Sequence, residues 1–128
     1  MSKVVTKTYT ISDLHPTGNT GATNLSSSSS YPYSNGYNST SNTSTYAYIQ
    51  ASSTNTTGYL YYTFTIPTIP DNATITSVTA AFRARFSYSS GVTGSAQLYA
   101  STTAKGSATS ITSGSTTSTV YNISNTGS

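Results

Sequence analysis

Two residues capable of acid–base chemistry, Asp13 and His15, lie close together near the start of the chain. An acid and a base at this spacing could move a proton, but no serine in a recognisable nucleophile elbow accompanies them. His15 is the only histidine, Asp71 is the only other acidic side chain, and cysteine is absent. We therefore expect turns at Asp13–His15 and at Asp71, with no catalytic residue, no metal site and no cofactor.

Two arginines, Arg83 and Arg85, lie two residues apart in an alternating stretch, so that both belong to the same side of a strand. Such a pair can bind a phosphate, a carboxylate or an acidic patch of a partner. The simpler interpretation is a solvated strand face, where charge discourages pairing between sheet edges. An interface salt bridge is the main alternative.

Three tyrosines, Tyr31, Tyr33 and Tyr37, stand among Ser, Asn, Gly and Pro. Binding loops favour this mixture, because tyrosine offers a rigid amphipathic contact surface while the small polar residues adapt to a partner. The rings could also stack on sugars, or pack over the edge of their own domain. We favour contact with another protein chain over contact with a glycan.

The composition excludes several classes of protein. Of 128 residues, 26 are Ser, 27 Thr and 9 Asn, while the five cations are scattered. Five cations are too few for a nucleic-acid binder that neutralises many phosphates. No apolar stretch has the length of a signal peptide or a membrane span, so we expect synthesis in the cytoplasm and no membrane association. Val, Ile, Leu and Phe total only 19 residues, which suggests that subunit contacts supplement a small core.

The elements that must position these residues are predicted to be strands. Residues 4–11 alternate and are rich in Thr, which predicts a first strand. Residues 12–45 show no regular period and predict a long loop or short irregular pieces. A strand is expected at 46–51, and the clearest alternation of the chain predicts another at 59–66.

A second long strand is expected at 75–88, with its apolar side inward because the opposite side carries two arginines. Further strands are expected at 96–100, 108–112 and 119–123, and a turn at 101–106. The sequence thus predicts an all-β, antiparallel β-sandwich. Its expected core consists of Leu60, Tyr62, Phe64, Ile66, Val78, Phe82, Phe86 and Leu98.

A single domain is expected, in two parts. Residues 1–45 would form a strand followed by a Ser- and Tyr-rich docking loop, and residues 46–128 would form the sandwich core.

The stretch from Gly58-Tyr59-Leu60-Tyr61-Tyr62 through Ile69-Pro70-Asp71-Asn72-Ala73-Thr74-Ile75 to Val78 resembles the jelly-roll domains of bacteriophage virion proteins and of bacterial surface and carbohydrate-associated proteins. The stretches Ala96-Gln97-Leu98-Tyr99, Thr103-Ala104-Lys105-Gly106 and Thr119-Val120-Tyr121-Asn122-Ile123 resemble phage tail or head-fibre sequences. Members of this pattern continue with a Trp-containing segment and at least two closing strands. The resemblance therefore implies either a shortened chain or a strand supplied by a neighbouring chain.

This resemblance implies a non-enzymatic structural protein of a bacteriophage virion, such as a decoration, fibre or tail component. Its partners would be other copies of itself and other virion proteins, and it would be located in the virion. The alternative is a bacterial adhesin or carbohydrate-binding module at the cell surface, with the loop tyrosines contacting a host glycan. A third hypothesis, that the chain is an accessory domain of an enzyme, rests on fold analogy alone.

Overall fold

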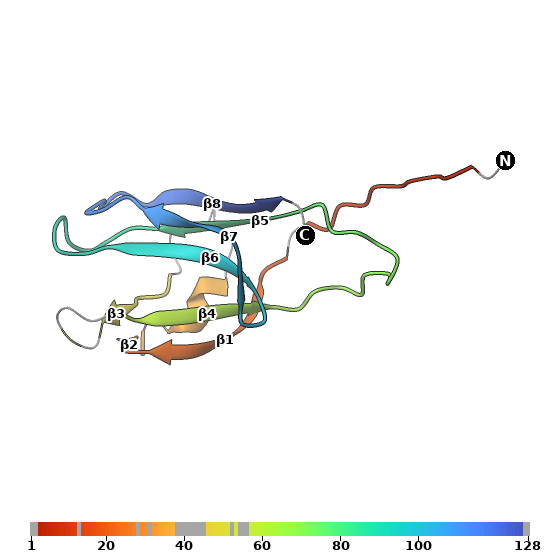
Figure 1. Cartoon of the computed structure of the whole chain (residues 1–128). Helices are drawn as coiled ribbons and strands as arrows, with labels where there is room; N and C mark the ends of the chain where they lie inside the picture. The colour runs from red at the N-terminus through yellow and green to blue at the C-terminus, as the bar shows by residue number, and fades with distance from the viewer. Residues whose placement is uncertain are drawn as a thin grey trace. The chain divides into compact units, whose positions relative to one another are not determined.

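The computed structural model describes residues 3–12, 14–27, 29–30, 32–37, 46–51, 53 and 57–126. In this part of the chain the regular structure is all β, apart from one short 3-10 helix (Figure 1). The elements are β1 (Pro16–Thr23), β2 (Leu25–Ser26), η1 (Tyr33–Tyr37), β3 (Gln50–Ala51), β4 (Tyr59–Phe64), β5 (Ser77–Ala84), β6 (Gly94–Ala100), β7 (Thr103–Ile111) and β8 (Thr119–Thr126).

The strands pair only two by two. β1 pairs with β4, β2 with β3, β5 with β8 and β6 with β7, and every pair is antiparallel. The all-β antiparallel class expected from the sequence is therefore confirmed, and the sheets are not closed into a barrel. Within the described residues, each strand keeps one edge without a backbone ladder. Such edges are the usual sites at which a further strand adds to a sheet.

The described residues form two compact units. The first comprises those up to Tyr37 and those from Tyr46 to Pro67, and the second those from Thr68 to Thr126. In the first unit, β1 lies in a region expected to be loop, so that expectation was wrong for Pro16–Thr23. Two register shifts interrupt the β1–β4 ladder. These bulges, together with glycines that carry no side chain, hide the alternation that would otherwise mark a strand.

The expected strand at 4–11 is not formed. The N-terminal segment has no strand arrow in Figure 1, and Val4 and Val5 are 87% and 79% exposed. Residues 46–51 form a strand only at Gln50–Ala51. Alternation and β-propensity express the fit of side chains to a sheet, and they produce a strand only where a neighbouring strand supplies hydrogen bonds.

In the second unit, β5 and β8 form the most regular ladder, with eight successive residue pairs and no register shift. Phe82 and Tyr121 oppose each other across it, and their rings stack at 5.4 Å with an interplanar angle of 22°. β5 is shorter than the expected 75–88, because Phe86 donates its backbone N–H to the carbonyl oxygen of Ser115 at 2.8 Å instead of continuing a ladder.

β6 and β7 form a hairpin whose turn is only Ser101–Thr102, so the turn expected across 101–106 is too long. Gly106 lies inside β7, where the register shifts and its φ of +69° suits a residue without a Cβ atom. β7 lies beside β8, since the Thr109 hydroxyl donates to the carbonyl oxygen of Asn122 at 2.9 Å. The strands expected at 96–100, 108–112 and 119–123 are confirmed as β6, part of β7 and part of β8.

Little apolar surface is enclosed. Ile123, 5% exposed, is the only hydrophobic side chain that is buried in the described part of the chain. Five residues of the expected core, Leu60, Tyr62, Phe82, Phe86 and Leu98, are partly buried. The other three were expected wrongly: Phe64, Ile66 and Val78 are 42%, 55% and 44% exposed. Phe64 is the last residue of β4, Ile66 lies beyond it, and Val78 is the second residue of β5.

Candidate functional site

Three tyrosines of the first unit form a cluster, which we call the tyrosine cluster: Tyr33 and Tyr37 from η1, and Tyr62 from β4. The ring of Tyr37 meets that of Tyr62 edge-on, with centroids 5.9 Å apart. The Tyr62 hydroxyl donates to the backbone carbonyl oxygen of Tyr33 at 3.0 Å. The Tyr37 hydroxyl donates to the Oδ1 of Asn19 on β1. η1 is therefore held against both strands of the β1–β4 sheet.

Asn35 and Gly36 shape η1 between the two tyrosines. The backbone N–H of Asn35 donates to the carbonyl oxygen of Pro32 at 3.0 Å, and its side-chain Nδ2 donates to the carbonyl oxygen of Tyr46 at 3.1 Å. A Cβ atom on Gly36 would overlap the hydroxyl of Tyr62. Glycine at this position therefore lets the helix approach closely enough for the Tyr62–Tyr33 hydrogen bond to form.

Burial chiefly, together with the neighbouring Tyr37 and Tyr33, raises the pKa of Tyr62 from 10.0 to about 12. A phenol in an apolar setting resists ionisation, because the anion loses more hydration than the neutral form does. Tyr62 is thus a neutral hydrogen-bond donor at physiological pH.

The loop tyrosines expected to contact a partner differ in the contacts that they make within the chain. Tyr37 is half-buried and its hydroxyl is engaged inside the unit, so it holds η1 in place. Tyr33 is also half-buried and accepts a hydrogen bond through its backbone. Tyr31 lies outside the described residues. Whether these residues also contact a partner stays a prediction.

Two tyrosines not selected from the sequence present a more accessible surface. Tyr59 and Tyr61 of β4 are 56% and 43% exposed, on the side of the strand opposite Leu60 and Tyr62. Residues two apart on one strand project from the same face at a spacing of about 6.7 Å. The signal was present in the sequence, since two aromatic residues occupy the side of an alternating strand that is ordinarily polar.

Arg83 and Arg85 belong to the second unit, so they are not part of the tyrosine cluster. Arg83 lies on β5, is half-buried, and donates from Nη1 to the carbonyl oxygen of Ser118 at 3.4 Å. Arg85 follows the end of β5 and is exposed. Part of Arg83 is therefore occupied by its own chain, and Arg85 is the more accessible cation.

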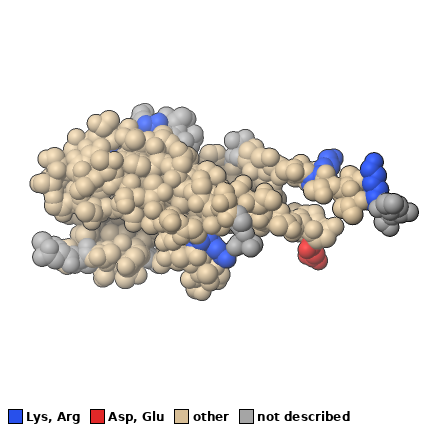
Figure 2. Space-filling view, turned by 45° about the horizontal axis from the view of Figure 1, so that its top comes forward, with Lys and Arg blue, Asp and Glu red and all other residues tan. Residues whose placement is uncertain are grey.

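The acid–base residues that the structure describes, His15 and Asp71, belong to different units. His15 is exposed, Asp13 lies outside the described residues, and Asp71 is exposed in a turn closed by the hydrogen bond from Ala73 N–H to the Pro70 carbonyl oxygen, 2.9 Å. No group of three or more metal-ligating side chains occurs among the described residues. Charged side chains are sparse and scattered on the face shown in Figure 2.

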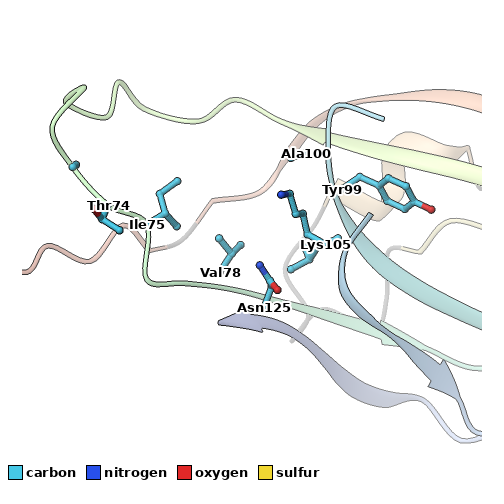
Figure 3. A pocket seen from close by; sticks show the side chains of 9 residues that line it. Thr74, Ile75, Val78, Tyr99, Ala100, Lys105 and Asn125 are labelled. Carbon is cyan, nitrogen blue, oxygen red and sulfur yellow. The ribbon is translucent and has the colours of Figure 1, made fainter. Parts of the chain in front are cut away.

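The second unit contains an open pocket of about 490 Å³. Its lining is mostly apolar, and Figure 3 shows Val78 and Asn125 projecting into the same space as Lys105, while the ring of Tyr99 points away. The lining residues are Ala73, Thr74, Ile75, Val78, Leu98, Tyr99, Ala100, Lys105 and Asn125.

No protein-family model matches the sequence, and searches of curated proteins and of solved structures return no similar protein. Among the described residues, no helix has the length and apolar character needed to span a membrane.

Proposed function

We propose that this chain is a non-enzymatic structural subunit that acts by packing against copies of itself and against other proteins of a bacteriophage virion. The observation that carries the proposal is the incomplete enclosure of its apolar side chains. Only Ile123 is buried among the described hydrophobic residues, while Ile66, Ile75 and Val78 are 55%, 49% and 44% exposed. Exposed apolar surface of this extent is typical of proteins that associate.

The strand edges support the same proposal. The described strands are paired only two by two, so that within the described part of the chain each strand forms a backbone ladder along one edge. Isolated two-stranded sheets are marginally stable, and a further strand or a packed layer stabilises them. The assignment to a virion rests on the resemblance of residues 46–123 to phage jelly-roll sequences, and the location follows from it.

Light scattering of the purified protein over a range of concentrations, followed by electron microscopy, tests the proposal. We expect a mass that is a multiple of 13.3 kDa and regular rings, filaments or particles. A second measurement tests the virion assignment: mass spectrometry of purified particles should find the chain in many copies. A protein that stays monomeric at every concentration and is absent from particles would contradict the proposal.

A second candidate function is glycan binding at a bacterial surface. It is favoured by Tyr59 and Tyr61, whose exposed rings lie on one face of β4. If this function holds, Tyr59→Ala with Tyr61→Ala abolishes binding on a glycan array, whereas Thr63→Ala, farther along the same strand, preserves it. Absence of wild-type binding to any glycan of the array would argue against this candidate and leave the structural role in first place.

A further inference from the structure

The N-terminal segment Val4–Ile11 has the properties of a strand that lacks its partner. Its residues alternate, with Val5, Tyr9 and Ile11 on one side and mostly threonine on the other. Tyr9 is 77% exposed and Ile11 is 49% exposed. β-branched and aromatic residues favour strands, so this segment retains strand propensity without a ladder to satisfy it.

The second unit offers the most regular edge on which such a strand can add. β5 has eight residues, as does Val4–Ile11, and its ladder with β8 runs without a register shift. β1 and β7 carry bulges, which twist a strand edge and make it a poorer template. The far edge of β5 therefore presents the longest even row of backbone groups among the described strands.

The side chains of the two segments also match. Val78, Ala80 and Phe82 share one side of β5, and Val78, which lines the apolar pocket, is 44% exposed. An added strand with Val5, Tyr9 and Ile11 on the same side would extend this apolar surface and leave the threonines toward solvent. Lys7 is the exception on that side, and its long side chain can carry the ammonium group to the sheet margin.

We propose that Val4–Ile11 of one copy adds as a strand to β5 of a second copy, along the edge that forms no ladder within the described part of the chain. The inference deepens the proposed function and rests on it, since it names the segment and the edge through which copies associate. Only four residues of the sequence separate the segment from β1. Short connections favour exchange of a segment between copies over closure within one copy.

Charge placed on either side of the segment tests the proposal in the full chain. Val5→Asp with Ile11→Asp puts two carboxylates on the apolar side, and Thr6→Asp with Thr10→Asp puts the same charges on the threonine side. Light scattering should show the dissociation constant rising by at least about tenfold in the first variant and by less than about twofold in the second.

The remaining outcomes are distinguishable. If the wild type assembles and the first variant assembles equally well, the strand-exchange inference is overturned while the structural role stands. If both variants weaken assembly equally, the effect does not depend on which side of the segment carries the charges, and the inference is overturned. If the wild type is monomeric at all concentrations, the structural role and the inference both fall.

A cross-link locates the edge without depending on stability. The chain has no cysteine, so Thr8→Cys and Ala81→Cys, in two separate proteins distinguished by a mass tag, supply the only thiols. Both positions are central in their segments and on the outward side, so a disulfide between the two proteins should form on mixing. Thr20→Cys on β1 replaces Ala81→Cys in the control. Linkage to β1 in place of β5, or no linkage between the proteins, would overturn the assignment.

Discussion

The hydroxyl of Tyr62 donates a hydrogen bond to the backbone carbonyl oxygen of Tyr33, 3.0 Å away, and so joins β4 to η1. The two residues are far apart in the sequence, and one contact between them fixes where the Tyr- and Asn-rich helix sits on the β1–β4 sheet.

Removing this hydroxyl should loosen η1. Tyr62→Phe keeps the ring and its edge-on contact with Tyr37 but leaves the Tyr33 carbonyl oxygen without its donor. We expect the free energy of unfolding to fall by about 0.5–1.5 kcal/mol, measured by urea denaturation. Tyr59→Phe is the matched control, because the Tyr59 hydroxyl has no partner in the described part of the chain. An equal loss in the control would refute the assignment.

The raised pKa of Tyr62 predicts a loss of stability at alkaline pH. The folded-state pKa, about 12, lies above the ordinary value of 10.0, so the folded protein holds this proton more tightly than the unfolded chain does. The contribution of Tyr62 to stability is therefore complete below pH 10 and declines as the pH rises from 10 toward 12. Thermal unfolding followed across this window should show the decline in the wild type and a smaller one in Tyr62→Phe. An identical pH dependence of the melting temperature in the two proteins would contradict the prediction.

Ile123 should be the most sensitive apolar position of the second unit. Its side chain is 5% exposed, and Ile123→Ala leaves a cavity in the one place where the described chain encloses apolar groups. We expect a loss of about 2–5 kcal/mol, enough to unfold a marginal domain. Val120→Ala on the same strand is the control, because Val120 is 38% exposed and should cost less than about 1 kcal/mol. Circular dichroism melts compare the two, and equal effects would disprove the prediction.

Two glycines with similar backbone angles should respond differently to alanine. Gly91 has a φ of +74° and open space around it, whereas Gly114 has a φ of +67° and lies against the backbone carbonyl of Ser89. Both substitutions place a Cβ atom in a left-handed conformation, at about 1–2 kcal/mol. Gly114→Ala should cost about 1–3 kcal/mol more, because its Cβ atom overlaps Ser89. Chemical denaturation of both variants measures the difference between their free energies of unfolding. Equal losses would show that a Cβ atom at position 114 does not overlap Ser89.

The strands with side-chain alternation could be predicted from sequence, and the others could not. The patterns at 59–66, 75–88 and 96–100 show an alternation of side chains with one apolar side, and they correspond to β4, β5 and β6. β1 was not predicted, because its glycines and two bulges interrupt the alternation of side chains. Val4–Ile11 shows the opposite failure, since its pattern is strand-like but no ladder partner is present in the described structure.

The candidate site was only partly predictable, for a related reason. A Tyr-rich loop is visible in sequence, but its contact with Tyr62 joins residues that no local pattern links. Tyr62 was expected as a core residue, because alternation reports which side of a strand is inward and not which partner lies there. Tyr59 and Tyr61 were overlooked because they share a strand with stronger apolar residues.

The pairing of β5 with β8 across the β6–β7 hairpin has a consequence for how the second unit folds. Ser77 pairs with Thr126 and Ala84 with Thr119, whereas β6 and β7 are joined by a two-residue turn. The hairpin is local and can form within about 1–10 μs, and once formed it shortens the loop that must close before β5 meets β8. During synthesis, β5 emerges from the ribosome long before β8. Until β8 has been synthesised, β5 lacks its ladder partner, and an unpaired strand edge is prone to aggregation.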